Sequence, residues 1–513
     1  MLDRLVNRVT MYRLILYYLV GLLIAAIVLS ASGVMHLSAI NIAISAVVLV
    51  AANYLINKLL ASIFNAPINP ESSIITGLIL ALIIPPDPTG TGLLFLLAAS
   101  GLAMGSKYLL SYKNKHIFNP AAVAVFLTAF GPHQTASWWV ATAPMMPFVL
   151  IGGLMLIRKL SRGAMFTTYF TATTVTTAAF SLYLGSHLGA DLKNMLLNSA
   201  VLFLGFVMLT EPYSSPDGKS KSFIYAAIVG VVLAPQFHIG HIYSTPEAAL
   251  LIGNIFAFIV SSKVKLFPVL VKKRLIAKDI AEFVYAPEKP LKYQPGQYME
   301  FTLPHTKTDS RGSRRYFTLA SSPTEPDLSV GVRFYKEGSS YKEAMADSER
   351  GDTIVAAQLS GDFTLPRDPK RKLVFIAGGI GITPFRSMLK YLIDKHEARN
   401  IVLFYAVSSV EYIAYRDVLD KAAAVLGLRI YYVISNKAAS GGLKNVINSR
   451  LNAHTIAHLV PDLNERMVYV SGPPNLIEDL RGSFEKIGLS RANIKVDFFS
   501  GYAWLVVSAK NTN

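Results

Sequence analysis

The feature that most constrains this 513-residue chain is a change of hydropathy near residue 262. Before that point, apolar stretches follow one another with few charges, whereas residues 275–513 have the composition of a soluble protein. The whole chain has a mean hydropathy of +0.41 and only 16% charged residues, which is unusual for a soluble protein. Its length predicts two to four domains. The change therefore predicts a membrane-embedded part, residues 1–265, followed by soluble domains.

Ten apolar segments are expected to form helices in this first part. Several are shorter than the roughly 20 residues that a straight membrane span needs. Short segments bounded by Gly or Pro are typical of broken or re-entrant helices, which are tolerated where their freed backbone groups line a cavity enclosed by protein. The segments are approximately 14–33, 38–57, 73–85, 91–106, 117–131, 138–157, 164–187, 192–210, 222–236 and 246–262.

The basic residues between these segments predict the orientation in the membrane. One side would carry only Lys193, and the side rich in Lys and Arg is cytoplasmic by the positive-inside rule. Both termini and the soluble domains are then cytoplasmic, which predicts a multi-pass protein of the inner (cell) membrane. The rich side would carry Arg4, Arg8, Arg13, Lys58, Lys107, Lys113, Lys115, Arg158, Lys159, Arg162, Lys219, Lys221, Lys263 and Lys265.

Residues 11–131 and 138–262 each hold five segments, and in each the third segment ends in a Pro/Asp turn. These turns are Pro85–Pro88 and Glu211–Asp217. An odd number of helices in each copy would invert the second copy, and inverted repeats with interrupted helices place a binding site near the midplane. Turns that contain Pro also end ordinary helices, which is the alternative explanation.

The net charge of +17 and the absence of cysteine exclude several classes of function. The basic residues cluster beside apolar segments and no aromatic–basic recognition motif is present, so nucleic acid is not an expected partner. A chain without cysteine cannot ligate an iron–sulfur cluster through thiolates, attach c-type haem or form disulfides. No metal ligands are predicted. We expect the first apolar run to be a retained helix and not a cleaved signal peptide.

Three strings in the apolar part carry a family resemblance: 72–78 (SSIITGL), 115–121 (KHIFNPA) and 210–216 (TEPYSSP). They resemble the large membrane subunit that Rnf complexes share with the Na⁺-translocating NADH:quinone reductase, over about residues 70–235. The resemblance implies a flavin held in the membrane part and membership of complexes that couple electron flow to ion transport. It suggests that the helix breaks at Phe118-Asn119-Pro120 and Glu211-Pro212 border the flavin site.

Flavinylated members of that family esterify FMN to a threonine in an Asp…Ser-Gly-Ala-Thr motif. The nearest equivalent here is 138–144 (WWVATAP), which lacks the glycine and the upstream aspartate. Thr142 is therefore a poor acceptor, and the second flavin, FMN or riboflavin, is expected to bind non-covalently. The tryptophan pair could instead anchor a helix at the membrane interface.

Residues 272–366 predict a small antiparallel barrel of short alternating strands. From residue 371 to 513, apolar strands alternate with helices, which predicts a βαβ domain with a parallel sheet. The predicted strands are 373–377, 401–406, 429–434 and 467–471. This order, with the motifs below, resembles the ferredoxin–NADP⁺ reductase superfamily over nearly all of residues 272–502, which implies an FAD-binding barrel and an NAD(P)-binding α/β domain.

The FAD-binding residues implied by the resemblance lie in two strings. The pattern Arg-x-[Tyr/Phe]-[Ser/Thr]-x-x-Ser aligns with residues 315–321, and a second phosphate contact is expected at a helix N-terminus, where free N–H groups face an anion. The Arg315 cation and the hydroxyl groups of Thr318 and Ser321 suit a flavin and its pyrophosphate. The expected FAD-binding residues are Arg315, Tyr316, Phe317, Thr318, Ser321, Gly338, Ser339 and Ser340.

The nicotinamide nucleotide is expected at a glycine turn between a strand and a helix, because only glycine lets the backbone approach a pyrophosphate closely. The family's Cys-Gly-Pro-Pro motif aligns with residues 471–474, with serine in place of cysteine, and its C-terminal aromatic segment aligns with residues 498–502. The expected cofactor-binding residues are Gly378, Gly379, Gly381, Thr383, Gly472 and Pro473. The expected catalytic residues are Thr383, Ser471, Phe499 and Tyr502.

The loop after the second βαβ strand, Ser408 to Glu411, carries an acid, which favours a free ribose hydroxyl and therefore NADH. Arg416 is a basic residue near this loop, so NADPH remains an alternative donor. Together these features predict an NAD(P)H-dependent flavin oxidoreductase that passes electrons to a membrane cofactor, because nicotinamide delivers electrons in pairs and flavin can release them singly. Quinone or an extracytoplasmic redox protein would be the acceptor. Ion transport and homo- or hetero-oligomerisation stay open.

Two other classes of function share parts of this pattern. A transmembrane haem reductase or oxidase uses the same soluble module but needs histidine pairs within adjacent helices, whereas the histidines of the apolar part fall at expected helix ends or loops. The other class is a transporter with a regulatory reductase domain, for which acids inside the membrane would be the main candidates. Glu211 and Asp217 lie at an expected break, where an acid more often caps or hydrogen-bonds the backbone.

Overall fold

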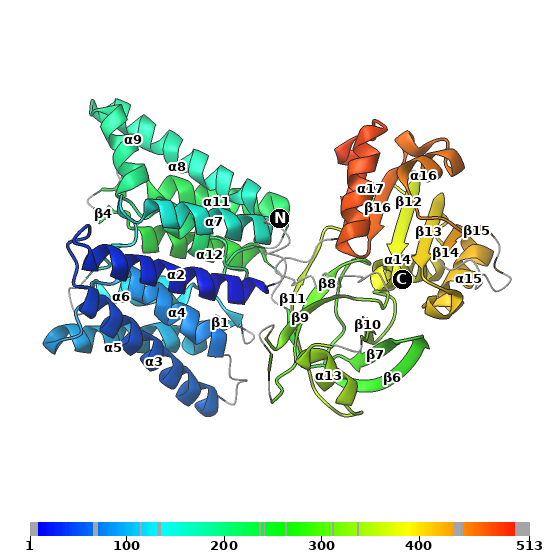
Figure 1. The fold of residues 1–513 in the computed structure, drawn as a ribbon, viewed down its shortest axis with the longest axis horizontal. Helices are drawn as coiled ribbons and strands as arrows, with labels where there is room; N and C mark the ends of the chain where they lie inside the picture. The colour runs from blue at the N-terminus through cyan, green and yellow to red at the C-terminus, as the bar shows by residue number, and fades with distance from the viewer. Residues whose placement is uncertain are drawn as a thin grey trace. The chain divides into compact units, whose positions relative to one another are not determined.

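A computed structural model describes residues 9–497 except 65–69, 113–114, 131–134, 217, 235–236, 241, 262–263, 307, 310–311, 336–337, 435–442 and 444. The chain forms two compact units that divide between Lys263 and Val264 (Figure 1). The first unit is helical. The second unit, which we call the reductase half, contains two sheet domains.

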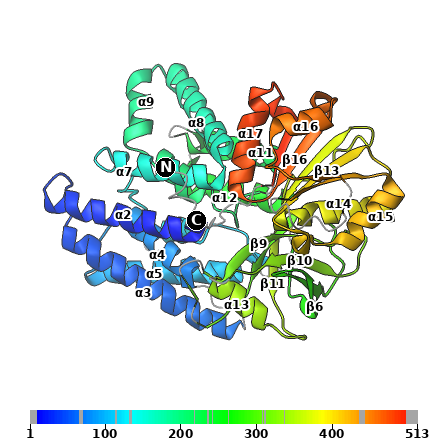
Figure 2. The same cartoon turned by 45° about the vertical axis from the view of Figure 1, so that its right-hand side comes forward.

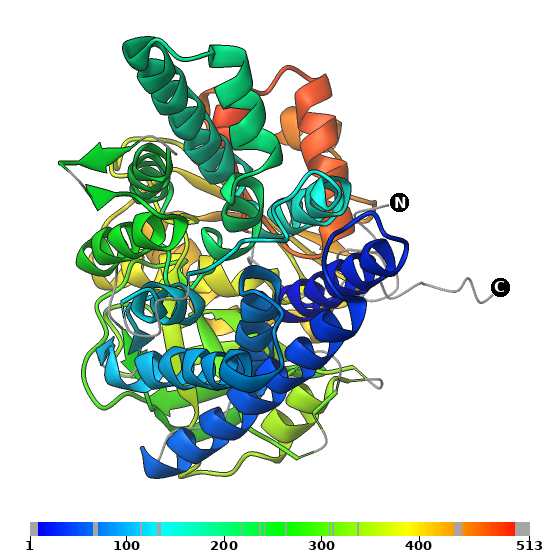
Figure 3. The same ribbon diagram turned by 90° about the vertical axis from the view of Figure 1, so that its left-hand side faces the viewer.

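Each of the ten expected apolar segments contains a helix (Figure 3). In the first five segments the helices are α2 (Met11–Ala31), α3 (Ala39–Ile63), α4 (Pro70–Ile83), α5 (Gly90–Leu109) and α6 (Pro120–Thr128). In the second five they are α7 (Met146–Leu160), α8 (Gly163–Leu184), α9 (Leu188–Leu197) with α10 (Val201–Phe203) and the π-helical η1 (Leu204–Met208), α11 (Lys219–Leu233) and α12 (Pro246–Val260).

Only three described helices, α2, α3 and α5, are long and apolar enough to cross a membrane. A fourth span is obtained if the pair 188–197 and 201–208, bent by 53°, is counted as one. Of the expected membrane part of about ten helices, three or four described helices therefore meet the length and composition of a span. The other segments are shortened by helix breaks, and in α8 the Thr-rich run 171–177 lowers the hydropathy.

Two segments begin later than the hydropathy pattern suggested, for local reasons. The helix α6 begins at Pro120 because the Asn119 side chain caps it by accepting a hydrogen bond from Ala122 N–H at 3.1 Å. Residues 138–145 are not helical: Trp138 has a φ of +48°, and Pro144 and Pro147 lack an N–H donor. The helix α7 therefore begins only at Met146.

The tryptophan pair does not anchor a helix at an interface. Both rings are buried, and their segment satisfies the carbonyls at the end of α4: Trp138 N–H donates to Ile83 O at 3.0 Å and Trp139 Nε1–H donates to Ile84 O at 2.9 Å. A helix end leaves carbonyl groups without intrahelical partners. The broken end of α4 is thus completed by residues 137–140.

Corresponding elements of the two five-segment halves pack in the same pairs. In the first half α3 contacts α5 and α5 contacts α6; in the second half α8 contacts α11 and α11 contacts α12. A two-strand hairpin follows α5 and α11: β1 (Ser111–Tyr112) with β2 (Lys115–His116), and β3 (His238–Ile239) with β4 (Ile242–Tyr243). After each hairpin, a residue whose side chain caps the next helix, Asn119 or Thr245, precedes a proline at the first helical position.

The expected barrel is formed by two antiparallel sheets with the strand orders β10-β7-β6 and β5-β11-β8-β9. Their apolar residues share one core, to which the helix α13 (Ser340–Asp347) contributes Tyr341 and Met345. The strands are β5 (Lys265–Leu266), β6 (Val269–Ala277), β7 (Ile280–Ala286), β8 (Tyr298–Thr302), β9 (Arg314–Thr318), β10 (Leu328–Arg333) and β11 (Val355–Ser360). We call residues 265–360 the barrel.

The α/β domain contains a six-stranded parallel sheet of order β15-β14-β13-β12-β16-β17 (Figure 2). Its strands are β12 (Leu373–Gly378), β13 (Ile401–Val407), β14 (Arg429–Ile434), β15 (Val446–Ile447), β16 (Met467–Ser471) and β17 (Ile494–Val496). The four predicted strands are confirmed to within one residue. One face packs on α14 (Thr383–Asp394) and α15 (Arg416–Leu426), the other on α16 (Ala453–Leu459) and α17 (Pro474–Lys486). We call residues 373–497 the nucleotide lobe.

Candidate functional site

Strand β9 presents the first motif on two faces of the barrel sheet, because successive side chains of a strand point to opposite sides. Arg315 and Phe317 share one face, and Tyr316 and Thr318 share the other. The Arg315 guanidinium lies 5.0 Å from the ring centre of Tyr341 in the first turn of α13. The expected flavin-phosphate cation is therefore held beside the helix that carries the second FAD string.

The N-terminus of α13 already receives a carboxylate in this structure. Ser340 N–H donates to Asp309 Oδ2 at 3.1 Å, and the Ser339 side chain caps the helix by accepting from Lys342 N–H. A carboxylate at a helix N-terminus stands in chemically for a phosphate, since both are anions that accept N–H bonds. The site therefore fits an anionic group such as the FAD pyrophosphate, with Gly338 immediately before it.

Ser321, an expected FAD-binding residue, makes hydrogen bonds within the barrel. Its hydroxyl oxygen accepts from Ser329 N–H at 3.0 Å and lies 3.0 Å from Tyr293 Oη, which itself donates to Ser321 O at 2.8 Å. These bonds tie the loop after β9 to strand β10 and to Tyr293 in the segment before β8. Ser321 therefore organises the motif from within the barrel.

The three glycines after β12 have different roles. A Cβ at Gly381 would lie 2.4 Å from Ser471 O, and one at Gly378 would lie 2.7 Å from Leu476 Cδ2, so both allow the turn to pack against the third motif. At Gly379, which has a φ of +53°, a Cβ would make only an ordinary van der Waals contact, with Arg333 Nη1 at 3.5 Å. Gly379 is thus the position at which a pyrophosphate can approach the backbone.

Arg333 is a site residue that the sequence patterns did not reveal. Its guanidinium lies 5.2 Å from the ring centre of Tyr335 and 4.9 Å from that of Tyr412, and its buried Nε has no hydrogen-bond partner among the described residues. A cation held between two rings beside Gly379 suits the pyrophosphate of a nicotinamide nucleotide. A lone arginine at the end of a strand carries no distinctive sequence signal.

Asp497, a second residue that sequence reasoning missed, lies beside Ser471 of the nicotinamide motif and near the Thr318 hydroxyl of the FAD motif. Ser471 Oγ donates to Asp497 Oδ2 at 2.9 Å, and the carboxyl is 4% exposed. Burial raises the pKa of Asp497 to about 7, which the Ser471 and Thr318 hydroxyls oppose and the Asp362 carboxylate reinforces. A carboxyl that titrates near neutrality is thus placed between the FAD motif and the nicotinamide motif.

Thr383 begins α14, and its hydroxyl donates to Ile380 O at 3.1 Å. Its methyl group faces Gly331 of β10, where a Cβ would lie only 2.9 Å away. Pro473 precedes the first residue of α17, and Gly472 packs against Gly378. The expected aromatic residues Phe499 and Tyr502 lie outside the described residues.

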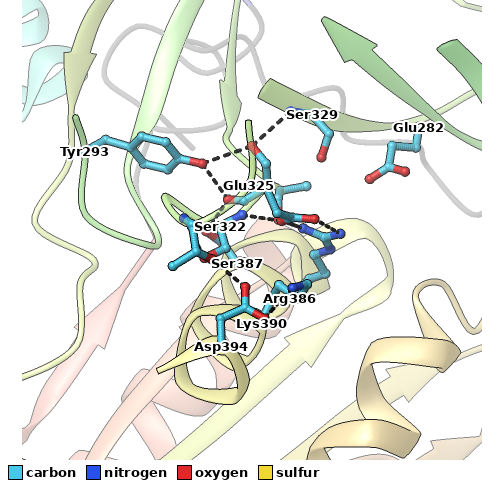
Figure 4. Close-up of polar contacts among 12 residues, drawn as sticks. Glu282, Tyr293, Ser322, Glu325, Ser329, Arg386, Ser387, Lys390 and Asp394 are labelled. Atoms are coloured by element: carbon cyan, nitrogen blue, oxygen red, sulfur yellow. Dashed lines mark hydrogen bonds and ion pairs between the residues drawn. The ribbon is translucent and has the colours of Figure 1, made fainter. Parts of the chain in front are cut away.

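The barrel and the nucleotide lobe are locked together beside this site (Figure 4). Arg386 of α14 forms a two-pronged ion pair with Glu325, with Nη2 donating to Oε1 at 2.9 Å, and its Nη1 donates to Ala320 O at 3.0 Å. Glu325 also accepts from Ser322 N–H at 2.6 Å. Because the Arg386 side chain is only 7% exposed, this pair has little access to water. The ion pair therefore fixes the position of the FAD motif relative to the glycine turn.

In the helical unit, the two expected helix breaks come into contact. Asn119 Nδ2 donates to Glu211 Oε2 at 2.7 Å, and Ser214 Oγ donates to the same oxygen at 2.9 Å. Asn119 N–H donates to Asn254 Oδ1 of α12 at 2.9 Å. The Thr142 hydroxyl, by contrast, is partly buried and donates to Trp139 O at 3.1 Å.

Comparison with known proteins shows what the reductase half is similar to. A family model described as the oxidoreductase NAD-binding domain matches residues 375–482. A flavohemoprotein of Bacillus subtilis is 28% identical over 240 residues, which cover 45% of this chain and 58% of that protein. An NADPH oxidoreductase of Mycobacterium tuberculosis is 28% identical over 203 residues, covering 39% of this chain and 50% of that protein.

A glycine betaine monooxygenase reductase subunit of Pseudomonas aeruginosa is 24% identical over 198 residues, which cover 38% of this chain and 53% of that protein. Among solved structures, the flavohem-like FAD/NAD-binding domain of a Vibrio cholerae nitric oxide dioxygenase has a TM-score of 0.41 and 19% identity, over 46% of this chain and 98% of that one. An Amycolatopsis cytochrome P450 reductase has a TM-score of 0.40 and 23% identity, over 46% of this chain and 70% of that one.

The chain spans between half and three fifths of the length of these curated relatives. Its C-terminal half is similar to a flavohemoprotein and to an NADPH oxidoreductase, and within it residues 375–482 match an oxidoreductase NAD-binding domain.

Proposed function

We propose that this protein is a membrane-bound flavoprotein oxidoreductase. It takes electrons from cytoplasmic NAD(P)H through FAD, passes them to a second cofactor in the helical unit, and delivers them to quinone or to an extracytoplasmic redox protein. The observation that carries this proposal is the hydrogen bond from Ser471 of the nicotinamide motif to the buried Asp497, near the Thr318 hydroxyl of the FAD motif, in a chain that also has apolar helices.

When bound, FAD would supply the chemistry by which the electron pair of a nicotinamide hydride is released as single electrons. The residues of the chain would bind and orient the two cofactors. Arg315 and the N-terminus of α13 would hold the FAD pyrophosphate, whereas Gly379 and Arg333 would hold that of the nicotinamide nucleotide. Asp497 would hold a proton between them below about pH 7. Phe499 and Tyr502 would shield the flavin, as the family resemblance implies.

NADH is the proposed donor. Glu411, in the loop after β13, pairs with Lys278 of the barrel at 2.9 Å, and both side chains are more than half exposed. Arg416 lies 3.6 Å from Asp420, so the basic residue that could favour a 2′-phosphate already has an acidic neighbour. An acid at this loop favours a ribose hydroxyl over a phosphate. Steady-state kinetics should give a lower KM for NADH than for NADPH; a lower KM for NADPH would reverse the assignment.

The second cofactor is proposed to be FMN or riboflavin, held non-covalently. Two observations support a binding site in the helical unit: its two halves repeat the same packing pairs, and the two helix breaks meet at Asn119 and Glu211. Interrupted helices that meet inside a repeat fold line binding sites in membrane proteins. Glu211 would also be the first residue to test for coupling to ion transport.

The decisive experiment is flavin analysis of the purified full-length protein. We expect FAD together with one further flavin that is released by denaturation, and bleaching of the flavin absorbance by NADH. FAD alone, with no quinone or haem, would remove the second cofactor from the proposal. A flavin peptide that survives denaturation would show covalent attachment, with Thr142 as the first residue to examine.

A further inference from the structure

A cluster of buried polar atoms lies where the barrel packs on the nucleotide lobe. Four of them have no hydrogen-bond partner among the described residues: Glu282 Oε1, Ser329 Oγ, Arg386 Nε and Tyr415 Oη. The four residues are between 1% and 6% exposed. A buried polar group without a partner costs about 1–3 kcal/mol, so four of them together would be a large penalty in a stable fold.

Glu282, Ser329 and Tyr415 border Gly331, and Arg386 lies beside Tyr415. Glu282 is the cross-strand neighbour of Gly331 in β7, and Ser329 is two residues before it in β10, so all three face the same side of the sheet. A Cβ at Gly331 would lie 2.8 Å from Tyr415 Oη, and the Arg386 guanidinium lies 5.7 Å from the Tyr415 ring centre. Figure 4 shows the Glu282 carboxylate and the Ser329 side chain close together near Arg386.

The charges around the cluster decide which ligand it can accept. Glu282 Oε2 receives Arg274 Nε–H at 2.7 Å, and Arg386 is paired with Glu325, so the positive and negative groups balance. A cation would be repelled by the two guanidinium groups and an anion by the Glu282 carboxylate. A neutral molecule that both donates and accepts hydrogen bonds is the chemistry that fits, and water is the smallest such molecule.

The hydrogen-bonding capacities of the four groups also match water. Glu282 Oε1 only accepts, Arg386 Nε only donates, and the two hydroxyls can do either. Burial, followed by the Glu282 carboxylate, raises the pKa of the Tyr415 phenol well above its ordinary value, so this hydroxyl stays protonated. One water molecule can donate to Glu282 and to a hydroxyl while it accepts from Arg386.

We propose that Glu282, Ser329, Arg386 and Tyr415 form an internal hydration site whose ordered water joins the barrel to the nucleotide lobe directly behind Thr383. The Thr383 methyl group contacts the same Gly331 that borders the site. The water would therefore complete the contact surface against which Thr383 is positioned, next to the Glu325–Arg386 ion pair.

A structure of the full-length protein at a resolution that shows ordered water tests the proposal directly. We expect at least one water peak within hydrogen-bonding distance of Glu282 Oε1 and of at least one of the other three atoms. Direct pairing of these side chains with one another, or a cluster without water density, would overturn the proposal.

Variants provide an independent test that uses the calorimetric unfolding midpoint of the full-length chain. Tyr415→Phe removes one hydroxyl of the site. Tyr405→Phe is its matched control, because Tyr405 is also buried but accepts from Ala414 N–H at 3.2 Å. If water bridges Tyr415 and Glu282, the midpoint shifts of Tyr415→Phe and Glu282→Gln will be non-additive, whereas Tyr405→Phe and Glu282→Gln will add. Additive shifts in both pairs would exclude a bridging water.

Discussion

At the scale of single residues, the nicotinamide site depends on a position that has no side chain. Gly379 combines a φ of +53° with a position where a Cβ would touch only Arg333 Nη1. Its neighbours Gly378 and Gly381 are required for packing against the third motif. The three glycines of one sequence string therefore serve two purposes, packing and cofactor approach. Substitutions at Gly378 and Gly381 should disturb the packing of the turn, whereas substitutions at Gly379 should disturb cofactor binding.

We expect Gly379→Glu to abolish reduction by NADH while FAD stays bound, because the carboxylate would occupy and repel the pyrophosphate. Gly379→Ala carries only the backbone cost of a side chain at positive φ, about 1 kcal/mol, and should keep most activity. Gly427→Ala, at a φ of +67° with open space around it, is the control for that cost elsewhere. Stopped-flow flavin bleaching measures the effect; an unchanged KM for NADH in Gly379→Glu would refute the placement.

Asp497 should make stability depend on pH. Its pKa is raised from 3.8 to about 7, so its stabilising contribution is fully present below about pH 4 and is lost as the pH rises through about 7. The full effect is on the order of 4 kcal/mol. Asp497→Asn should flatten the decline of the unfolding midpoint between pH 5 and pH 8. Equal declines in the variant and the wild type would show that another group titrates.

At the scale of elements, the relation between the barrel and the nucleotide lobe is set by α14. Its first turns carry Thr383 for the cofactor and Arg386 for Glu325, and Ser387 Oγ donates to Ser321 O at 2.5 Å. The helix that begins at the glycine turn therefore also holds the loop after the FAD motif. A displacement of α14 would move both cofactor sites together.

Glu325→Gln should destabilise the reductase half by about 3 kcal/mol, because Arg386 would remain buried without its carboxylate. Lys278→Met breaks the exposed pair with Glu411 and should have a much smaller effect, because solvent screens an exposed ion pair. Thermal release of FAD from the full-length protein, followed by flavin fluorescence, compares the two variants. Similar losses in both would show that burial of the Arg386 pair has no special importance.

At the scale of the whole molecule, the main prediction concerns the membrane. Three apolar helices of sufficient length, a repeated packing pattern and a one-sided distribution of basic residues favour an integral membrane protein with a cytoplasmic reductase half. The absence of cysteine allows this topology to be tested with single introduced thiols.

Lys193→Cys should react with a membrane-impermeant maleimide added to intact cells, whereas Lys58→Cys should react only after the cells are opened. Both lysines are exposed in the structure, so a difference would report the side of the membrane and not burial. Labelling of both positions from outside, or of Lys58→Cys alone, would contradict the proposed orientation.

The sequence by itself determined the split of the chain, the order of barrel and parallel sheet, and the four central strands of that sheet. These properties follow from local periodicity and from motifs contiguous in the chain, which hydrophobic burial and turn chemistry impose residue by residue. The lengths of the membrane-part helices were less predictable, because the capping at Asn119 and the turn at Trp138 end or delay helices within apolar stretches.

Only the tertiary structure decided which distant residues share a site. The contact of Asp497 with Ser471, the approach of Arg333 to Gly379 and the meeting of Asn119 with Glu211 join residues far apart in the chain. None of these pairs has a local pattern, since each depends on the packing of several elements. The tertiary structure also distinguished the glycines and serines that pack against neighbouring segments from those that are available to a cofactor. Burial and backbone proximity decide this, and both are properties of the assembled fold.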